Sequence, residues 1–306
     1  MASRPRSNPR MMAVLGALLL ITAACASDST APAVSDGDST GGAVSATDVG
    51  GGASGGSGEA TAGSATDGGS GSASTEGSGS GGTTADGGPE AIGVGSRPVG
   101  GVAAALLQPG RGDRVVVEVR AQAGAAPRQA TVDHIVQVLK AASGKSVSVD
   151  GIDSIGGGER DWTQQQVIAA AASAAQVESG RSQVVLRLLF LRGTYGGDGA
   201  VLGVAVAGDV AAVFSDRVDS AAGLLVDPAG VEDAVAIHET GHLLALVDLI
   251  VGSGRADPDH PGHSRNKRSV MYWAVESDLI SQLFDGGIPR DFDADDRAEL
   301  AQIRAG

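Results

Sequence analysis

The sequence predicts an α/β fold with a mixed, mostly parallel, twisted sheet and helices packed against it. Strand-like and helix-like segments alternate between residues 115 and 214, and this order is typical of parallel strands joined by helices. A further helix-periodic stretch, 230–245, contains the run His-Glu-Thr-Gly-His at 238–242. Residues 248–306 show no clear strand pattern, so a small and mainly helical part should complete the fold.

Most of the expected elements are bounded by residues that favour their ends. Pro127 and Gly144 bound the first helix, because proline suits a first turn and glycine suits a C-terminus. Asp161 is the predicted N-cap of the second helix, which Gly180 ends. Residues 184–191 form the most apolar run and should be the central strand. The predicted strands are 115–120, 147–149, 184–191, 200–207 and 210–214, and the predicted helices are 127–142, 161–179, 230–245, 276–284 and 294–304.

Residues 1–25 have the pattern of an export signal. Arginines precede an apolar run, 11–24, that is too short to span a bilayer stably. Small residues then lead into Cys25, the only cysteine of the chain. This ending resembles the lipobox of bacterial lipoproteins, although Thr22 stands where that family prefers an aliphatic residue. The resemblance implies that Cys25 is lipidated and becomes the mature N-terminus; the alternative is an ordinary cleaved signal.

Residues 26–91 are rich in small and polar residues and contain almost no large apolar side chain. Such a segment cannot bury enough surface to offset its ordering entropy, so we expect a disordered tether. The remaining residues, 92–306, are enough for one folded domain. A net charge of −14 argues against nucleic acid as a partner. We therefore expect a domain held at the outer face of the cytoplasmic membrane by a lipid on Cys25, or secreted if the signal is simply cleaved.

The run at 238–242 predicts a metal site on a helix. Two histidines four residues apart lie one turn apart, with Cβ atoms about 5–6 Å from each other, so His238 and His242 can bind one metal ion. Glu239 then faces the open side of the metal and can take a proton from bound water. This is the H-E-x-x-H pattern of zinc peptidases, which predicts Zn²⁺ as the cofactor and Glu239 as the catalytic base.

The third ligand must lie beyond His242, because a catalytic zinc ion usually has three protein ligands and one water molecule. Four of the five histidines lie in the range 238–263, and this clustering supports a metal. Asp248 can be a ligand only if the helix ends before it, since on a continuing helix it would rotate about 80° off the histidine face. The candidates are Asp248, either of His260 and His263, and, as a minor alternative, Glu276.

The segment resembles the metzincin metallopeptidases, whose pattern is H-E-x-x-H-x-x-G-x-x-H or D followed by a methionine turn. The resemblance implies a zincin-like α+β domain, with an upper subdomain at about 112–247 and a lower one at about 248–306. It implies Asp248 as third ligand, as in the aspartate-bearing branch that includes snapalysin, and Met271 as the methionine of the turn. One departure is Ala245, which stands where metzincins have glycine. An alanine in the left-handed conformation costs roughly 1–2 kcal/mol.

The predicted function is that of a zinc-dependent endopeptidase acting on a peptide or protein substrate. A substrate strand could pair with the exposed edge strand near 200–206 through backbone hydrogen bonds. The alternative is a tethered surface-binding module with a structural or non-catalytic metal site. Asp257 and Asp259 are additional candidates for weak calcium binding.

Overall fold

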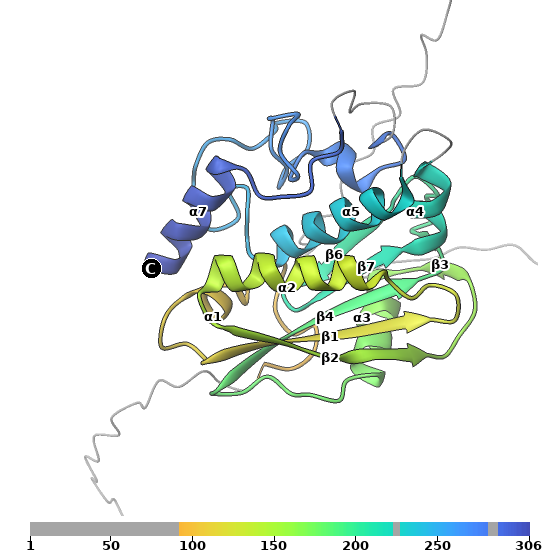
Figure 1. Ribbon diagram of the computed structural model, residues 1–306, viewed down its shortest axis with the longest axis horizontal. Coiled ribbons are helices and arrows are strands. Elements are labelled where there is room, and N and C mark those ends of the chain that lie inside the picture. The colour runs from red at the N-terminus through yellow and green to blue at the C-terminus, as the bar shows by residue number, and fades with distance from the viewer. Residues whose placement is uncertain (1–91, 223–226, 281–286) are drawn as a thin grey trace, which may run out of the picture. The chain divides into compact units, whose positions relative to one another are not determined.

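The computed structural model describes residues 92–222, 227–280 and 287–306 (Figure 1). The predicted export signal, the predicted lipidation site Cys25 and the whole of the predicted tether, 26–91, lie outside the described residues. So does most of the second half of the predicted helix 276–284. Within the described residues, no helix combines the length and the apolar character that a membrane span requires.

The core of the fold is a five-stranded sheet with the strand order β2-β1-β4-β7-β6. Four strands are parallel, and β6 runs antiparallel to β7 at one edge. The predicted α/β class with a mixed, mostly parallel sheet is confirmed, and the most apolar run is its central strand β4. The strands are β1 (Arg114–Gln122), β2 (Ser146–Ile155), β4 (Gln183–Leu191), β6 (Gly203–Ala207) and β7 (Val210–Phe214), with β3 (Arg160–Trp162) and β5 (Gly193–Tyr195) forming a separate pair.

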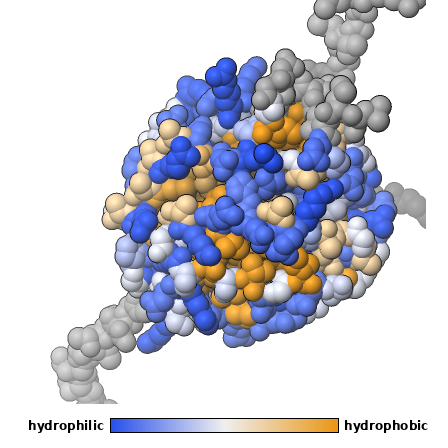
Figure 2. All heavy atoms as spheres, in the orientation of Figure 1, coloured by the Kyte–Doolittle hydropathy of each residue, from blue (hydrophilic) through white to orange (hydrophobic). Residues whose placement is uncertain are grey.

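Helices cover both faces of the sheet (Figure 1). Side chains of α1, α2, α4, α5 and α7 share one apolar cluster with one face of the sheet, and α3 packs against the other. In the view of Figure 2, polar side chains cover most of the visible surface and apolar ones gather below its centre. The helices are α1 (Ala103–Leu107), α2 (Gln129–Ser143), α3 (Gln164–Ser173), α4 (Ser215–Ala222), α5 (Pro228–Leu243), α7 (Ala294–Ala305) and the 3-10 turn η1 (Trp273–Glu276).

Two predicted helices differ from those observed. The helix predicted at 161–179 starts later, because Thr163 and Gln166 form a reciprocal capping box at its N-terminus. Asp161 is not the N-cap; its carboxylate accepts hydrogen bonds from Thr194 and from the backbone N–H of Gly197. The helix predicted from residue 276 does not begin there, since Glu276 is the last residue of η1. Glu276 therefore lies at the end of a tight turn and not at the start of a helix.

Charged side chains are buried on the face of the sheet that α3 covers. Arg187 of β4 pairs with Glu118 of β1 and with Asp209, at N···O distances of 2.9 Å each. Glu118 also pairs with Arg120 at 2.8 Å. Removing any one partner would leave a buried charge, so the network fixes the β6–β7 turn relative to the central strands. The strand β6 ends at this turn, and its Gly203 packs against Glu239 of α5.

Candidate metal centre

Helix α5 (Pro228–Leu243) carries the first candidate metal ligands, His238 and His242. Its start follows from local chemistry: the Asp227 side chain accepts a hydrogen bond from the N–H of Ala229, and Pro228 occupies the first turn. Residues 231–243 are all buried, including His238, Glu239 and His242. Polar side chains on a helix buried on all sides need partners, because desolvation without compensation is costly.

Helix α5 ends in a capping motif at Leu244 and Ala245. Ala245 donates a hydrogen bond to the carbonyl of His242, and Leu246 donates one to the carbonyl of Gly241. This is the Schellman arrangement, and Ala245 occupies its left-handed position with φ of 62°. The helix therefore ends as it would with glycine, at the cost in backbone energy expected for alanine. Asp248, with φ of 63°, lies in the loop beyond.

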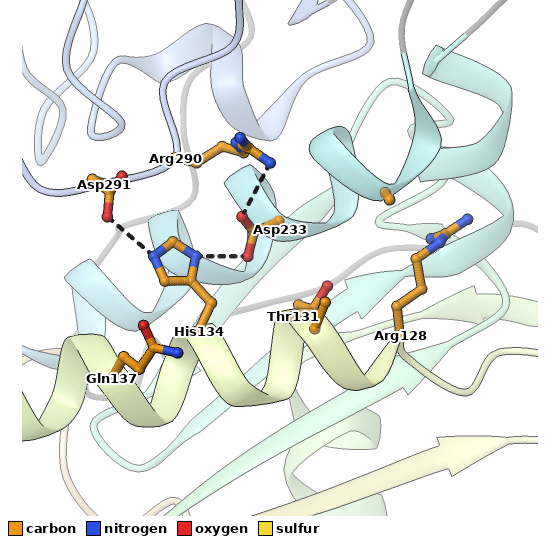
Figure 3. A pocket seen from close by; sticks show the side chains of 9 residues that line it. Arg128, Thr131, His134, Gln137, Asp233, Arg290 and Asp291 are labelled. Carbon is orange, nitrogen blue, oxygen red and sulfur yellow. Dashed lines mark hydrogen bonds and ion pairs between the residues drawn. The ribbon is translucent and has the colours of Figure 1, made fainter.

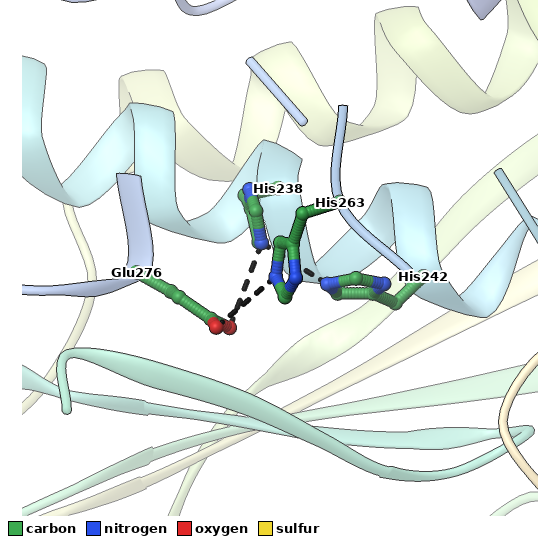
Figure 4. Close-up of side chains that lie close together, drawn as sticks. All are labelled: His238, His242, His263 and Glu276. Atoms are coloured by element: carbon green, nitrogen blue, oxygen red, sulfur yellow. Dashed lines mark hydrogen bonds and ion pairs between the residues drawn. The ribbon is translucent and has the colours of Figure 1, made fainter. Parts of the chain in front are cut away.

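Four side chains converge on one point (Figure 4). One potential ligand atom from each of His238, His242, His263 and Glu276 lies within 4.8 Å of all the others. The Nε2 atoms of His238 and His242 are 3.0 Å apart. The carboxylate of Glu276 lies 3.0 Å from Nε2 of His263 and 3.6 Å from Nε2 of His238. We refer to these four residues as the His₃Glu cluster.

The hydrogen bonds of His238 show which of its nitrogens faces the cluster with a lone pair. Its Nδ1 lies 2.7 Å from the carbonyl oxygen of Val270. Because a carbonyl can only accept, Nδ1 carries the proton and Nε2 presents a lone pair to His242. Metal-binding histidines are commonly oriented in this way by a carbonyl on the far nitrogen. Three imidazoles and one carboxylate also form a donor set that suits Zn²⁺, so the residues fit the predicted ion.

The turn around Met271 positions two members of the cluster. The carbonyl of Val270 orients His238, and the carbonyl of Met271 accepts a hydrogen bond from the N–H of Ser264 at 2.7 Å, next to His263. The Met271 side chain packs against Gly241 of α5, where an added Cβ would overlap its sulfur atom. Met271 therefore lies directly against α5, the helix that carries His238 and His242.

The electrostatics of the cluster follow from burial. Burial, reinforced by the neighbouring His238 and His263, lowers the pKa of His242 well below its ordinary value. Burial alone would lower the pKa of His263, but the charge and hydrogen bond of Glu276 raise it. Burial and the charge of Glu276 raise the pKa of Glu239 well above its usual range. Within the described residues, no side chain donates a hydrogen bond to Glu239, so its carboxylate is available for chemistry.

The other candidate ligands lie elsewhere. The Asp248 carboxylate accepts hydrogen bonds from the backbone of Ser253, Gly254 and Ala256, and stabilises that loop. It is outside the His₃Glu cluster. His260 stacks on Trp273, with ring centroids 4.4 Å apart.

Asp257 and Asp259 are the residues predicted to bind calcium weakly. The Asp257 carboxylate accepts a hydrogen bond from the backbone N–H of Asp259 at 2.9 Å. Within the part of the chain that the structure describes, the only group of three or more metal-binding side chains is the His₃Glu cluster, so no such group gathers around Asp257 and Asp259. Weak calcium binding here therefore stays a prediction.

His134 lies between two carboxylates, beside the N-terminal half of α5 (Figure 3). Nδ1 of His134, on α2, is 2.8 Å from Asp233 of α5, and its Nε2 is 3.1 Å from Asp291. These residues line an open pocket of about 400 Å³, at whose rim Arg290 approaches Asp233. Burial alone would lower the pKa of His134, but its two acidic partners raise it. We call His134 and these three neighbours the His134 cluster.

Comparisons with known proteins identify related folds. No protein-family model and no curated protein sequence matches the chain. The structure is similar to an archaemetzincin from Methanopyrus kandleri, with 18% identity and a TM-score of 0.41 over 63% of this chain and 97% of that one. It is similar to an archaemetzincin from Archaeoglobus fulgidus, with 15% identity and a TM-score of 0.35 over 62% and 99%. A zinc-dependent peptidase from Methanocorpusculum labreanum shows 16% identity and a TM-score of 0.38 over 60% and 99%. At these identities the likeness is one of fold alone.

Proposed function

We propose that the protein is a zinc-dependent endopeptidase in which His238, His242 and His263 hold the metal and Glu239 is the general base. The observation that carries this proposal is the convergence of three buried imidazoles beside a buried carboxylate that no side chain neutralises. A purely structural metal site has no use for such a carboxylate, because it would only add an unpaired buried charge.

The chain holds Glu239 in a defined position. Gly203 of β6 packs directly against it: a Cβ added at Gly203 would lie 2.5 Å from Oε1 of Glu239. When bound, zinc would polarise a substrate carbonyl and promote deprotonation of water. Glu239 would accept a proton from that water and pass it to the leaving nitrogen. The adjacent strand β6 lies at an edge of the sheet, which supports pairing with an extended peptide substrate.

The decisive experiment replaces the base without removing the ligands. Glu239→Gln should retain zinc and lose peptide cleavage by about 100-fold or more, within the range of general-base contributions. Casein and a mixed peptide library would be the substrates, with a chelator-treated sample for comparison. An exposed glutamate of the loop before β4 provides the matched control, Glu178→Gln, which should cleave normally. Full cleavage by Glu239→Gln would contradict the assignment.

We also propose that a lipid on Cys25 tethers the domain to the outer face of the cytoplasmic membrane. The support is the sequence of residues 1–25 and the long segment 26–91 rich in small and polar residues. Cys25→Ser should move the protein from the membrane fraction to the soluble fraction of cells. A protein that is soluble with Cys25 intact would indicate an ordinary cleaved signal.

A second candidate function is a binding module with a non-catalytic metal site. One observation favours it: with Glu276, four protein groups surround the site, which is the number that structural zinc sites use. This alternative predicts stoichiometric zinc with no hydrolysis of any peptide in a broad library. Chelator-sensitive cleavage would exclude it.

A further inference from the structure

Glu276 differs from the three histidines of the His₃Glu cluster in its exposure. The histidine side chains are at most 6% exposed, whereas the Glu276 side chain is 26% exposed. Glu276 also comes from the tight turn η1, while His238 and His242 come from the buried helix α5. It is therefore the member of the cluster on the solvent side, where a catalytic zinc site keeps its open position.

The backbone of the same segment pairs with the start of the edge strand. The N–H of Leu202 donates to the carbonyl of Glu276 at 2.8 Å, and the N–H of Asp278 donates to the carbonyl of Ala200 at 2.9 Å. Val201 and Ser277 form an antiparallel bridge between these two bonds. Residues 276–278 thus pair with 200–202 through one antiparallel bridge, and 200–202 lead directly into β6. A peptide bound by strand addition to 200–202 would use the same backbone groups.

We propose that Glu276 is a fourth protein ligand of the metal and that residues 276–278 form an autoinhibitory segment in the place of the substrate. The inference rests on the proposed peptidase function. A single segment places a carboxylate at the metal centre and hydrogen-bonds to the backbone that leads into the edge strand. A peptide substrate must displace both contacts before its own carbonyl reaches the centre. The four-ligand arrangement is then the resting state of the enzyme, and removing the carboxylate opens it.

The test uses cobalt in place of zinc, because the visible absorption of Co²⁺ responds to the number and kind of its ligands without any need for activity. Wild-type protein loaded with Co²⁺ should show the intense absorption of a four-coordinate ion, and added azide should leave it unchanged. In Glu276→Ala a water molecule should take the place of the carboxylate, so the absorption should differ in position from that of wild type and shift on addition of azide, which replaces the water. Glu178→Ala, which removes an exposed glutamate, should behave as wild type. Identical, azide-sensitive spectra for wild type and Glu276→Ala would overturn the proposal.

Kinetics separate this proposal from the proposed function. If residues 276–278 block the site in about nine-tenths of the molecules, removing the Glu276 carboxylate should raise kcat/KM for short peptides by about tenfold. A Glu276→Ala variant with altered cobalt spectra but less cleavage than wild type would overturn the autoinhibitory role. If no variant cleaves any peptide, the peptidase function fails, while the cobalt spectra still decide whether Glu276 is a ligand. Glu276→Gln, which keeps the shape of the side chain, serves as the second variant should Glu276→Ala fold poorly.

Discussion

Helix α5 takes part in two histidine clusters that differ in the groups facing the imidazole nitrogens. In the His134 cluster, both ring nitrogens of His134 face carboxylates, and Arg290 lies nearby. In the His₃Glu cluster, Nε2 of His238 faces Nε2 of His242 at 3.0 Å, and the centre of the cluster is lined mainly by nitrogens. The first cluster is half-buried and open to a pocket, while the three histidines of the second are buried almost completely.

The difference shows what distinguishes a histidine that binds a metal from one that supports the fold. A histidine between carboxylates is satisfied by a proton, which gives it a positive charge and two hydrogen bonds. Histidines whose lone pairs converge cannot all be satisfied by protons, because neighbouring imidazolium groups would repel one another in a buried site. A divalent cation would satisfy all of them at once, so the convergence of three imidazoles favours a metal-binding role.

The largest expected effect is the loss of zinc on removal of a converging histidine. His263→Ala should lower zinc affinity by more than the 10–100-fold that loss of an outer-shell partner typically causes, and leave the dialysed protein without metal. His134→Ala should keep one zinc ion per chain, because its partners are carboxylates outside the cluster. Metal analysis after dialysis measures both. Asp248→Ala should also keep its zinc. If Asp248→Ala lost zinc and His263→Ala retained it, Asp248 would be the third ligand instead of His263.

A smaller effect concerns the packing beneath the metal-binding half of α5. Gly241→Ala should destabilise the fold by about 1–3 kcal/mol, because its Cβ would overlap the sulfur of Met271. Gly230→Ala on the same helix meets no atom within 4 Å and should be neutral or stabilising by about 0.5–1 kcal/mol. Urea unfolding of the zinc-bound protein compares the two. Equal free energies of unfolding would show that Met271 does not pack tightly against the helix.

The smallest effect is the pH dependence of the His134 cluster. Because the pKa of His134 is raised in the folded protein, its pairing stabilises the fold fully below the ordinary histidine pKa of about 6.5. That stabilisation is lost as the pH rises through the raised folded-state pKa. The difference in unfolding free energy between wild type and His134→Gln should be about 1 kcal/mol or less at acidic pH and vanish at alkaline pH, since the pair is partly exposed. A difference that is constant with pH would show that His134 acts through packing alone.

Several features could be predicted because they depend on neighbours in the chain. The spacing of His238 and His242 places both on one side of a helix whatever the rest of the fold does. The apolar run of β4 predicted the central strand, since a strand covered on both faces is apolar along most of its length. The start of α3 was misplaced at Asp161, because Asp161 and Thr163 are both good caps and only tertiary contacts of Asp161 with Thr194 separate them.

The sequence by itself determined the α/β class, the metal-binding helix and the approximate set of candidate ligands. These follow from periodicity and from the chemistry of adjacent side chains, which act over a few residues. Only the tertiary structure decided that His263 and Glu276 join His238 and His242 while Asp248 stabilises a loop. The reason is that a ligand from a loop is placed by contacts distant in sequence, such as the hydrogen bonds of Ser264 with Met271 and of Leu202 with Glu276. No local pattern encodes those distances.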